Sequence, residues 1–219
     1  MSINGCVNLR KILYNKIEKI ISEKTCYIEN GDIIHPRGIF NIPKGLCLEL
    51  GCGNFIFELE YKTKVIGIDK EKLSNSKNFI HGNLSDINVW NKFDDSSISC
   101  ITSIACLHWI KEIDFIFNQC NKKLAPKGKM FHFLWHENNF DYPIYQLLSN
   151  FSAKKTQDMC VTNVEKLTTI TNNAGFKILD IFSYITKFYF NEISLIEKLN
   201  AEYRPKAEFI VLIAEKNNN

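Results

Sequence analysis

The chain has 219 residues, of which 45% are hydrophobic, and this suits one α/β domain with a full apolar core. Its net charge of only +3 gives no broad positive field for nucleic acid, and no apolar stretch suggests a membrane span or a signal peptide. The eight cysteines include no Cys-x-x-Cys pair and no cluster at metal-ligand spacing, and several lie in apolar runs, as reduced thiols do. We therefore expect a monomer in the reducing cytoplasm, with no metal and with neither nucleic acid nor membrane as a partner.

The first 45 residues are predicted to form a helix that leads into a loop. Six apolar residues recur at helical spacing over about four turns: Leu9, Ile12, Leu13, Ile17, Ile20 and Ile21. Residues 30–45 contain three glycines and two prolines, which favours a loop. Arg37 lies in this loop and is expected to be solvated, with pairing to a carboxylate as the alternative.

Residues 46–135 are predicted to alternate strands with helices. Strands are expected at residues 46–50, 64–69, 78–82, 97–103 and 129–135, and helices at residues 54–62, 71–76 and 113–124. Asn54 is a good N-cap for the first helix, and Pro126 and Gly128 end the last one. Such alternation is typical of a parallel sheet with helices on both faces.

Residues 136–219 are predicted to add further helices and two strands. Helices are expected at residues 142–151, 162–174 and 193–200, and strands at residues 176–185 and 207–215. Thr162 and Glu165 form a capping box for the middle helix, and Gly175 follows its end.

A glycine turn closes the first predicted strand. Leu46–Leu50 is apolar apart from Glu49, and Gly51, Cys52 and Gly53 follow it. Glycine lets the chain turn tightly and lets a ligand approach the backbone. A dinucleotide site would have a further glycine at position 56, where this sequence has isoleucine, and Glu49 would repel a pyrophosphate. The turn therefore favours a ligand whose nearest charge is positive.

Asp69 ends the next predicted strand. It lies about 20 residues beyond the start of the glycine turn, the spacing at which a carboxylate binds the hydroxyls of a nucleotide ribose. S-adenosylmethionine (SAM) carries an ammonium group and a ribose but no phosphate, so it matches acids at Glu49 and Asp69. The simpler alternative is a strand that ends in a tight turn and binds nothing.

The run Glu49-Leu50-Gly51-Cys52-Gly53, together with Asp69, resembles motifs one and two of the class I SAM-dependent methyltransferases. The resemblance implies a single-domain, Rossmann-like α/β fold with a seven-stranded, mostly parallel sheet and an antiparallel last strand. It divides residues 1–219 into an N-terminal helix and lid loop (1–45), a SAM-binding core (46–135), and lid helices with the last strands (136–219). SAM is then the cofactor.

Further cofactor contacts are expected just beyond the other strands, because ligands bind at the carboxyl ends of parallel strands. The resemblance places Lys70 beside Asp69, and Asn83 and Leu84 beside the adenine, although the family usually has aspartate where this chain has asparagine. Ser103 is expected at the end of the fourth strand. Alternatively, Asn83 caps its own loop.

The triplet Leu107-His108-Trp109 narrows the resemblance to the branch that contains malonyl-[acyl-carrier protein] O-methyltransferase of biotin synthesis and trans-aconitate methyltransferase. It implies that His108 and Trp109 are catalytic, with His108 orienting the acceptor or acting as a base. Arg204 is the candidate partner for an acceptor carboxylate, with an exposed ion pair in its loop as the alternative. Alternatively, His108 caps the loop and Trp109 packs under the sheet.

Three residues depart from the family pattern. Phe55 stands in place of a third glycine and is expected to tighten the pocket for the methionine part of SAM. Ile104 stands where the branch often has asparagine, and Lys127 replaces a glycine. These departures leave the acids and glycines of the first motif in place.

Three functions are compatible with this pattern. The first is methylation of the free carboxylate of malonyl-[acyl-carrier protein], which is already anionic and needs no general base. Lysines should then surround the cleft mouth and attract the acidic carrier, with these candidates: Lys122, Lys123, Lys154 and Lys155. The second is methylation of another acceptor, such as trans-aconitate or an amine. The third is a non-catalytic protein of this fold that acts in assembly.

Overall fold

The computed structural model describes residues 26–55, 57–136, 160, 163–184 and 209–217. The predicted N-terminal helix, the helices at residues 142–151 and 193–200, Thr162 and Arg204 lie outside these residues. Within them, no helix is long and apolar enough to cross a membrane.

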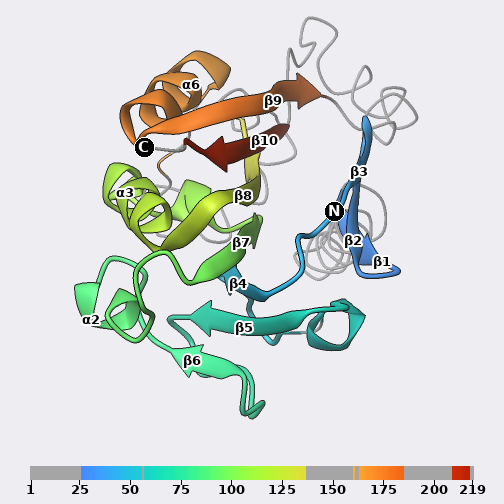
Figure 1. Ribbon diagram of the computed structural model, residues 1–219, viewed down its shortest axis with the longest axis vertical. Coiled ribbons are helices and arrows are strands. Elements are labelled where there is room, and N and C mark those ends of the chain that lie inside the picture. The colour runs from blue at the N-terminus through green and yellow to red at the C-terminus, as the bar shows by residue number, and fades with distance from the viewer. Residues whose placement is uncertain (1–25, 56, 137–159, 161–162, 185–208, 218–219) are drawn as a thin grey trace, which may run out of the picture.

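A seven-stranded sheet forms the centre of the fold (Figure 1). In spatial order its strands are β6 (Phe79–His81), β5 (Lys64–Asp69), β4 (Leu46–Leu50), β7 (Ile98–Ile104), β8 (Leu124–Trp135), β10 (Phe209–Lys216) and β9 (Phe176–Tyr184). The strands from β6 to β8 pair in parallel, and β10 is antiparallel to both β8 and β9. The predicted fold class, with its antiparallel last strand, is confirmed.

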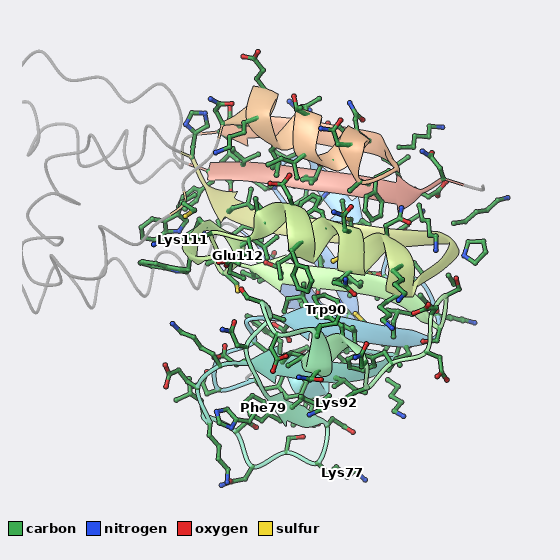
Figure 2. All side chains as sticks on the ribbon, turned by 90° about the vertical axis from the view of Figure 1, so that its left-hand side faces the viewer. Lys77, Phe79, Trp90, Lys92, Lys111 and Glu112 are labelled. Atoms are coloured by element: carbon green, nitrogen blue, oxygen red, sulfur yellow. The ribbon has the colours of Figure 1, made fainter. Side chains whose placement is uncertain are left out.

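Three helices cover one face of this sheet: α2 (Ile87–Trp90), α3 (Ile113–Lys123) and α6 (Val164–Asn173) (Figure 1). Figure 2 looks onto this face, where Trp90 is fully buried near the middle. The apolar stripe of α3 packs against Leu48 and Ile101 of the sheet, and this accounts for the helical spacing in the sequence. One continuous core therefore holds the parallel strands in register.

A small antiparallel sheet packs on the opposite face, where the sequence predicted only a loop. Its strands are β1 (Tyr27–Glu29), β2 (Asp32–His35) and β3 (Gly38–Phe40). Ile33 and Phe40 join a second apolar cluster, and the Phe40 ring lies 5.4 Å from that of Phe131 on β8. Arg37 is exposed, as predicted for a loop arginine, and its guanidinium also pairs with the Asp180 carboxylate of β9 at 2.9 Å.

Two predicted helices are wrong. Residues 54–62 form a turn and a single 3₁₀ turn, Glu58–Glu60, and Asn54 caps no α-helix. Residues 71–76 are irregular, because the Ser76 amide bonds to the hydroxyl of Ser74 instead of forming a helical ladder.

The last helix begins slightly later than predicted. Asn163 is the N-cap of α6, and its side chain accepts a hydrogen bond from the Lys166 amide at 2.8 Å. The helix ends as predicted before Gly175, which has a positive φ of 81°.

Candidate functional site

The glycine turn lies where the carboxyl ends of β4 and β5 meet. The amides of Gly51 and Cys52 both donate to the carbonyl of Ile68, at 2.7 and 3.2 Å, and so fix the turn to the end of β5. A Cβ atom at Gly51 would overlap the Cys106 side chain, whereas one at Gly53 would meet nothing within 4 Å. Since φ at Gly53 is 58°, this residue presents bare backbone to open space, as ligand approach requires.

The Asp69 carboxylate lies directly beside this turn. Its Oδ2 accepts a hydrogen bond from the Gly53 amide at 2.8 Å, and its Oδ1 accepts one from the Glu71 amide at 2.9 Å. A carboxylate has about four acceptor sites, so two remain for hydroxyl groups. The structure therefore brings together the turn and the acid that the sequence predicts to act jointly.

Glu49 is buried beneath the turn, with only 3% of its surface exposed. Its Oε2 atom has no hydrogen-bond partner in the described part of the chain. Burial raises the pKa of this carboxyl to about 8, although a hydrogen bond from Tyr61 opposes the rise. The side chain is thus an unsatisfied acid that a positive ligand group would complete.

Of the two residues predicted to contact the adenine, one is exposed and the other is buried. Asn83 is exposed, and its side-chain oxygen accepts a hydrogen bond from the Ser85 amide at 3.0 Å, so it does cap its own loop. Leu84 is buried in the core, and its carbonyl accepts from the indole of Trp90 at 2.8 Å. Lys70 is exposed just beyond Asp69. Adenine binding by Asn83 and Leu84 stays a prediction.

Ser103 is the next-to-last residue of β7, close to the strand end as predicted. Its side chain is fully buried, and its Oγ has no hydrogen-bond partner among the described residues. Its neighbour across the β7–β8 ladder is His132, whose pKa is lowered to about 3 by burial. This placement gives no support to a side-chain contact between Ser103 and the cofactor.

Cys52 and Phe55 both pack inward on β5. A Cβ atom at Gly67 would lie 2.6 Å from the Cys52 sulfur and 2.9 Å from the Phe55 ring, so glycine makes room for both. The backbone of Phe55 adopts a φ of 57°, and its side chain is only 4% exposed. These two side chains pack against Gly67 beneath the turn, and the expected effect of Phe55 on the methionine pocket stays a prediction.

An aromatic cluster lies at the carboxyl ends of β7 and β8. The 3₁₀ helix Leu107–Trp109 carries His108, whose ring stacks on Trp135 at 5.1 Å and lies 5.2 Å from Trp109. Trp109 is 40% exposed, whereas His108 is only 1% exposed. Trp109 therefore reaches the surface and does not pack under the sheet.

His108 is a neutral hydrogen-bond donor in this cluster. Burial lowers its pKa to about 3, so the ring carries one proton at neutral pH. Its Nδ1 accepts from the Trp135 amide at 3.4 Å, which places the proton on Nε2. Nε2 has no partner within the described residues. The ring therefore keeps one donor that no described residue uses.

Of the lysines expected at the cleft mouth, Lys122 and Lys123 lie elsewhere, and Lys154 and Lys155 lie outside the described residues. Lys123 is buried at the end of α3, where its ammonium donates to the Phe93 carbonyl and the Asp95 carboxylate at 2.8 and 2.7 Å. Lys122 lies 3.6 Å from the same carboxylate. Both are at the far end of α3 from Lys111 and Glu112, which Figure 2 labels where the helix begins.

Comparison with known proteins identifies the family. A family model described as a methyltransferase domain matches residues 29–181, which include the glycine turn, Asp69 and the aromatic cluster. The chain belongs to this family. It is a SAM-dependent methyltransferase by fold and domain, and its cofactor is SAM. Among curated protein sequences, none matches this chain.

Solved methyltransferase structures share the fold at low sequence identity. A SAM-dependent methyltransferase from Mesorhizobium loti is 15% identical, with a TM-score of 0.60 over 80% of this chain and 92% of that one. One from Listeria monocytogenes is 16% identical, with a TM-score of 0.60 over 81% and 93%. A phosphoethanolamine N-methyltransferase from Haemonchus contortus, in complex with S-adenosylhomocysteine, is 14% identical, with a TM-score of 0.57 over 80% and 50%.

The site of this methyltransferase fits SAM. The open backbone at Gly53 and the carboxylate of Asp69 suit the ribose, and the unsatisfied acid of Glu49 suits the ammonium group. Two residues of the site escaped the sequence interpretation. Tyr61, which contacts Glu49, falls in a segment predicted to be helical, and Trp135 ends a strand with no motif to mark it. Each is recognised as part of the site only through its contact with a motif residue, Glu49 for Tyr61 and His108 for Trp135.

Proposed function

We propose that this methyltransferase acts on the free carboxylate of a small or carrier-bound acid, and that malonyl-[acyl-carrier protein] is the first acceptor to test. The state of His108 is the observation that carries the proposal. Its Nε2–H has no acceptor among the described residues, and its pKa of about 3 keeps the ring neutral near pH 7.

Such a ring suits a carboxylate better than an amine or a hydroxyl acceptor. A carboxylate is anionic at neutral pH and accepts hydrogen bonds, so it needs a donor to orient it and no base to activate it. An ammonium or hydroxyl acceptor must lose a proton, and His108 is a poor base because burial disfavours its protonated form.

Different residues of the chain would then bind the cofactor and the acceptor. Bound SAM supplies an electrophilic methyl group on its sulfonium. Glu49 and Asp69 hold the ammonium and ribose, and His108 holds a carboxylate oxygen so that the acceptor is oriented for attack. Trp109 and Trp135 exclude water from the same place. Arg204, outside the described residues, is the proposed cation that offsets desolvation of the acceptor.

The test is transfer of a labelled methyl group from SAM to malonyl-[acyl-carrier protein] and malonyl-CoA. We expect a methyl ester on at least one of these, and we expect Arg204→Ala to lower turnover much more than SAM affinity. The gene should also restore growth without biotin in a host that lacks its own malonyl methyltransferase.

Other outcomes would redirect the proposal. Failure of the rescue, together with methylation of trans-aconitate, would assign the protein to that acceptor. SAM binding without transfer to either acid would favour a non-catalytic role in assembly.

A further inference from the structure

Glu49 is the one buried acid among the residues that the structure describes, and no cation is paired with it there. An ionised carboxylate in such a place loses its hydration without gaining a counter-charge. The side chain nevertheless lies at the carboxyl end of β4, one residue before the glycine turn begins. This environment favours the neutral form of the carboxyl group as long as no positively charged ligand group lies beside it.

The groups that surround Glu49 do not supply a positive charge. Tyr61 approaches from beyond the 3₁₀ turn and also lies 3.0 Å from the hydroxyl of Thr102 on β7. The thiols of Cys47 on β4, Cys100 on β7 and Cys52 in the turn are all buried, and Asp69 on β5 is a second acid. None of these groups is a cation, and the hydrogen bond from Tyr61 favours the ionised form of Glu49 less than burial opposes it.

We propose that binding of the ammonium group of SAM is coupled to release of one proton from the Glu49 site, so that the affinity of the protein for SAM rises with pH. This inference rests on the assignment of SAM as the cofactor. An ammonium group beside the carboxyl favours its ionised form, and the proton then leaves to solvent. The number of protons released is also one if the ligand's ammonium group, and not Glu49, loses the proton. In either case the carboxyl and the amine together hold one proton fewer in the complex.

The size of the coupling follows from the free state. Because the pKa of the free carboxyl is about 8, Glu49 is largely protonated at pH 6.5 and release should approach one proton per ligand. The apparent affinity should rise about tenfold or more from pH 6 to pH 7.5 and then level off, because an α-amino group titrates near 7.7–8.0.

Calorimetry of S-adenosylhomocysteine (SAH) binding to the full chain at pH 6.5 tests this directly. Titration in phosphate and in imidazole, which differ in ionisation enthalpy and both accept a proton at this pH, should give different binding enthalpies that correspond to nearly one released proton. 5′-Methylthioadenosine keeps the nucleoside and the sulfur but lacks the amino acid part, so its enthalpy should not depend on the buffer.

Two variants test whether the released proton comes from the Glu49 site. Glu49→Gln should bind SAH without proton release, whereas Glu60→Gln, the same substitution at an exposed site nearby, should behave as the wild type does. SAH binding with a buffer-independent enthalpy in the wild type would overturn the inference and leave the cofactor assignment intact. No SAH binding at all would overturn both. The wild-type titrations decide the matter even if Glu49→Gln does not fold.

Discussion

The two halves of the site are built by different means. The cofactor half is made of backbone amides and two acids, and all of its main parts lie between Glu49 and Asp69. The proposed acceptor half is aromatic and neutral, and it joins the segment at His108 to the far end of β8 at Trp135. A site that recognises a fixed cofactor can be encoded in one short stretch, whereas the acceptor half depends on how distant strands meet.

The largest effect should come from Asp69→Ala. This change removes the acceptors for the ribose hydroxyls and also frees the amides of Gly53 and Glu71, which the carboxylate now holds. Each charge-assisted hydrogen bond contributes about 1.5–3 kcal/mol, so SAH affinity should fall at least tenfold. Calorimetry on a variant shown to be folded by circular dichroism measures the change, and an unchanged dissociation constant would place the ribose elsewhere.

Glu49→Gln should alter stability in a pH-dependent way. The pKa of the folded state, about 8, lies above the unfolded value of 4.5, so the stabilisation by the protonated group is full below pH 4.5 and is lost as the pH rises through 8. One pKa unit corresponds to about 1.4 kcal/mol, so the total loss is on the order of 5 kcal/mol. Without ligand, Glu49→Gln should therefore be more stable than the wild type at pH 8.5.

Urea unfolding at pH 5 and pH 8.5 tests this expectation, with Glu60→Gln as the matched control. The wild type and the control should lose stability between the two pH values, and Glu49→Gln should lose less. Equal losses in all three proteins would mean that Glu49 is ionised in the folded protein.

His108→Phe should separate the two halves. Phenylalanine keeps the stacking on Trp135 but removes the Nε2 donor, whose hydrogen bond to a charged oxygen contributes about 1.5–3 kcal/mol. Turnover with a carboxylate acceptor should fall roughly tenfold to a hundredfold, and SAH affinity should not change. In the wild type, His108 should give no titration in the rate between pH 5 and 8, and a limb near pH 6.5 that disappears in His108→Phe would identify a base.

Trp109→Ala should have the smallest effect. Its side chain is 40% exposed, so the variant should keep its unfolding free energy within about 1 kcal/mol. The Michaelis constant for the acceptor should rise a few-fold because one aromatic wall is lost, while SAH affinity stays the same. A large loss of SAH affinity would mean that this indole belongs to the cofactor half.

Much of the fold could be predicted because its strands are continuous apolar runs. Lys64–Asp69 and the helix starting at Ile113 were placed correctly from local pattern alone. The helix predicted at residues 54–62 was wrong because Phe55 turns inward onto Gly67, so packing overrides a good N-cap. The small sheet was missed because its strands are three or four residues long and lie among glycines and prolines.

The candidate site, too, could be predicted only in part from the sequence. Glu49, Gly53 and Asp69 are close in the sequence, and strand order alone brings them to one edge. The stacking of His108 on Trp135 could not be predicted, since 27 positions separate them and neither residue type is unusual in a core. The burial of the Ser103 side chain depends on how β7 pairs with β8, and this strand register cannot be deduced from the sequence motif.

Binding of SAH and of NAD to the wild-type chain, compared by calorimetry under one set of conditions, tests the central claim most directly. The acid before the glycine turn and the carboxylate of Asp69 match an ammonium group and a ribose, so SAH should bind with one-to-one stoichiometry and NAD should give no heat of binding. Binding of NAD without binding of SAH would contradict the account.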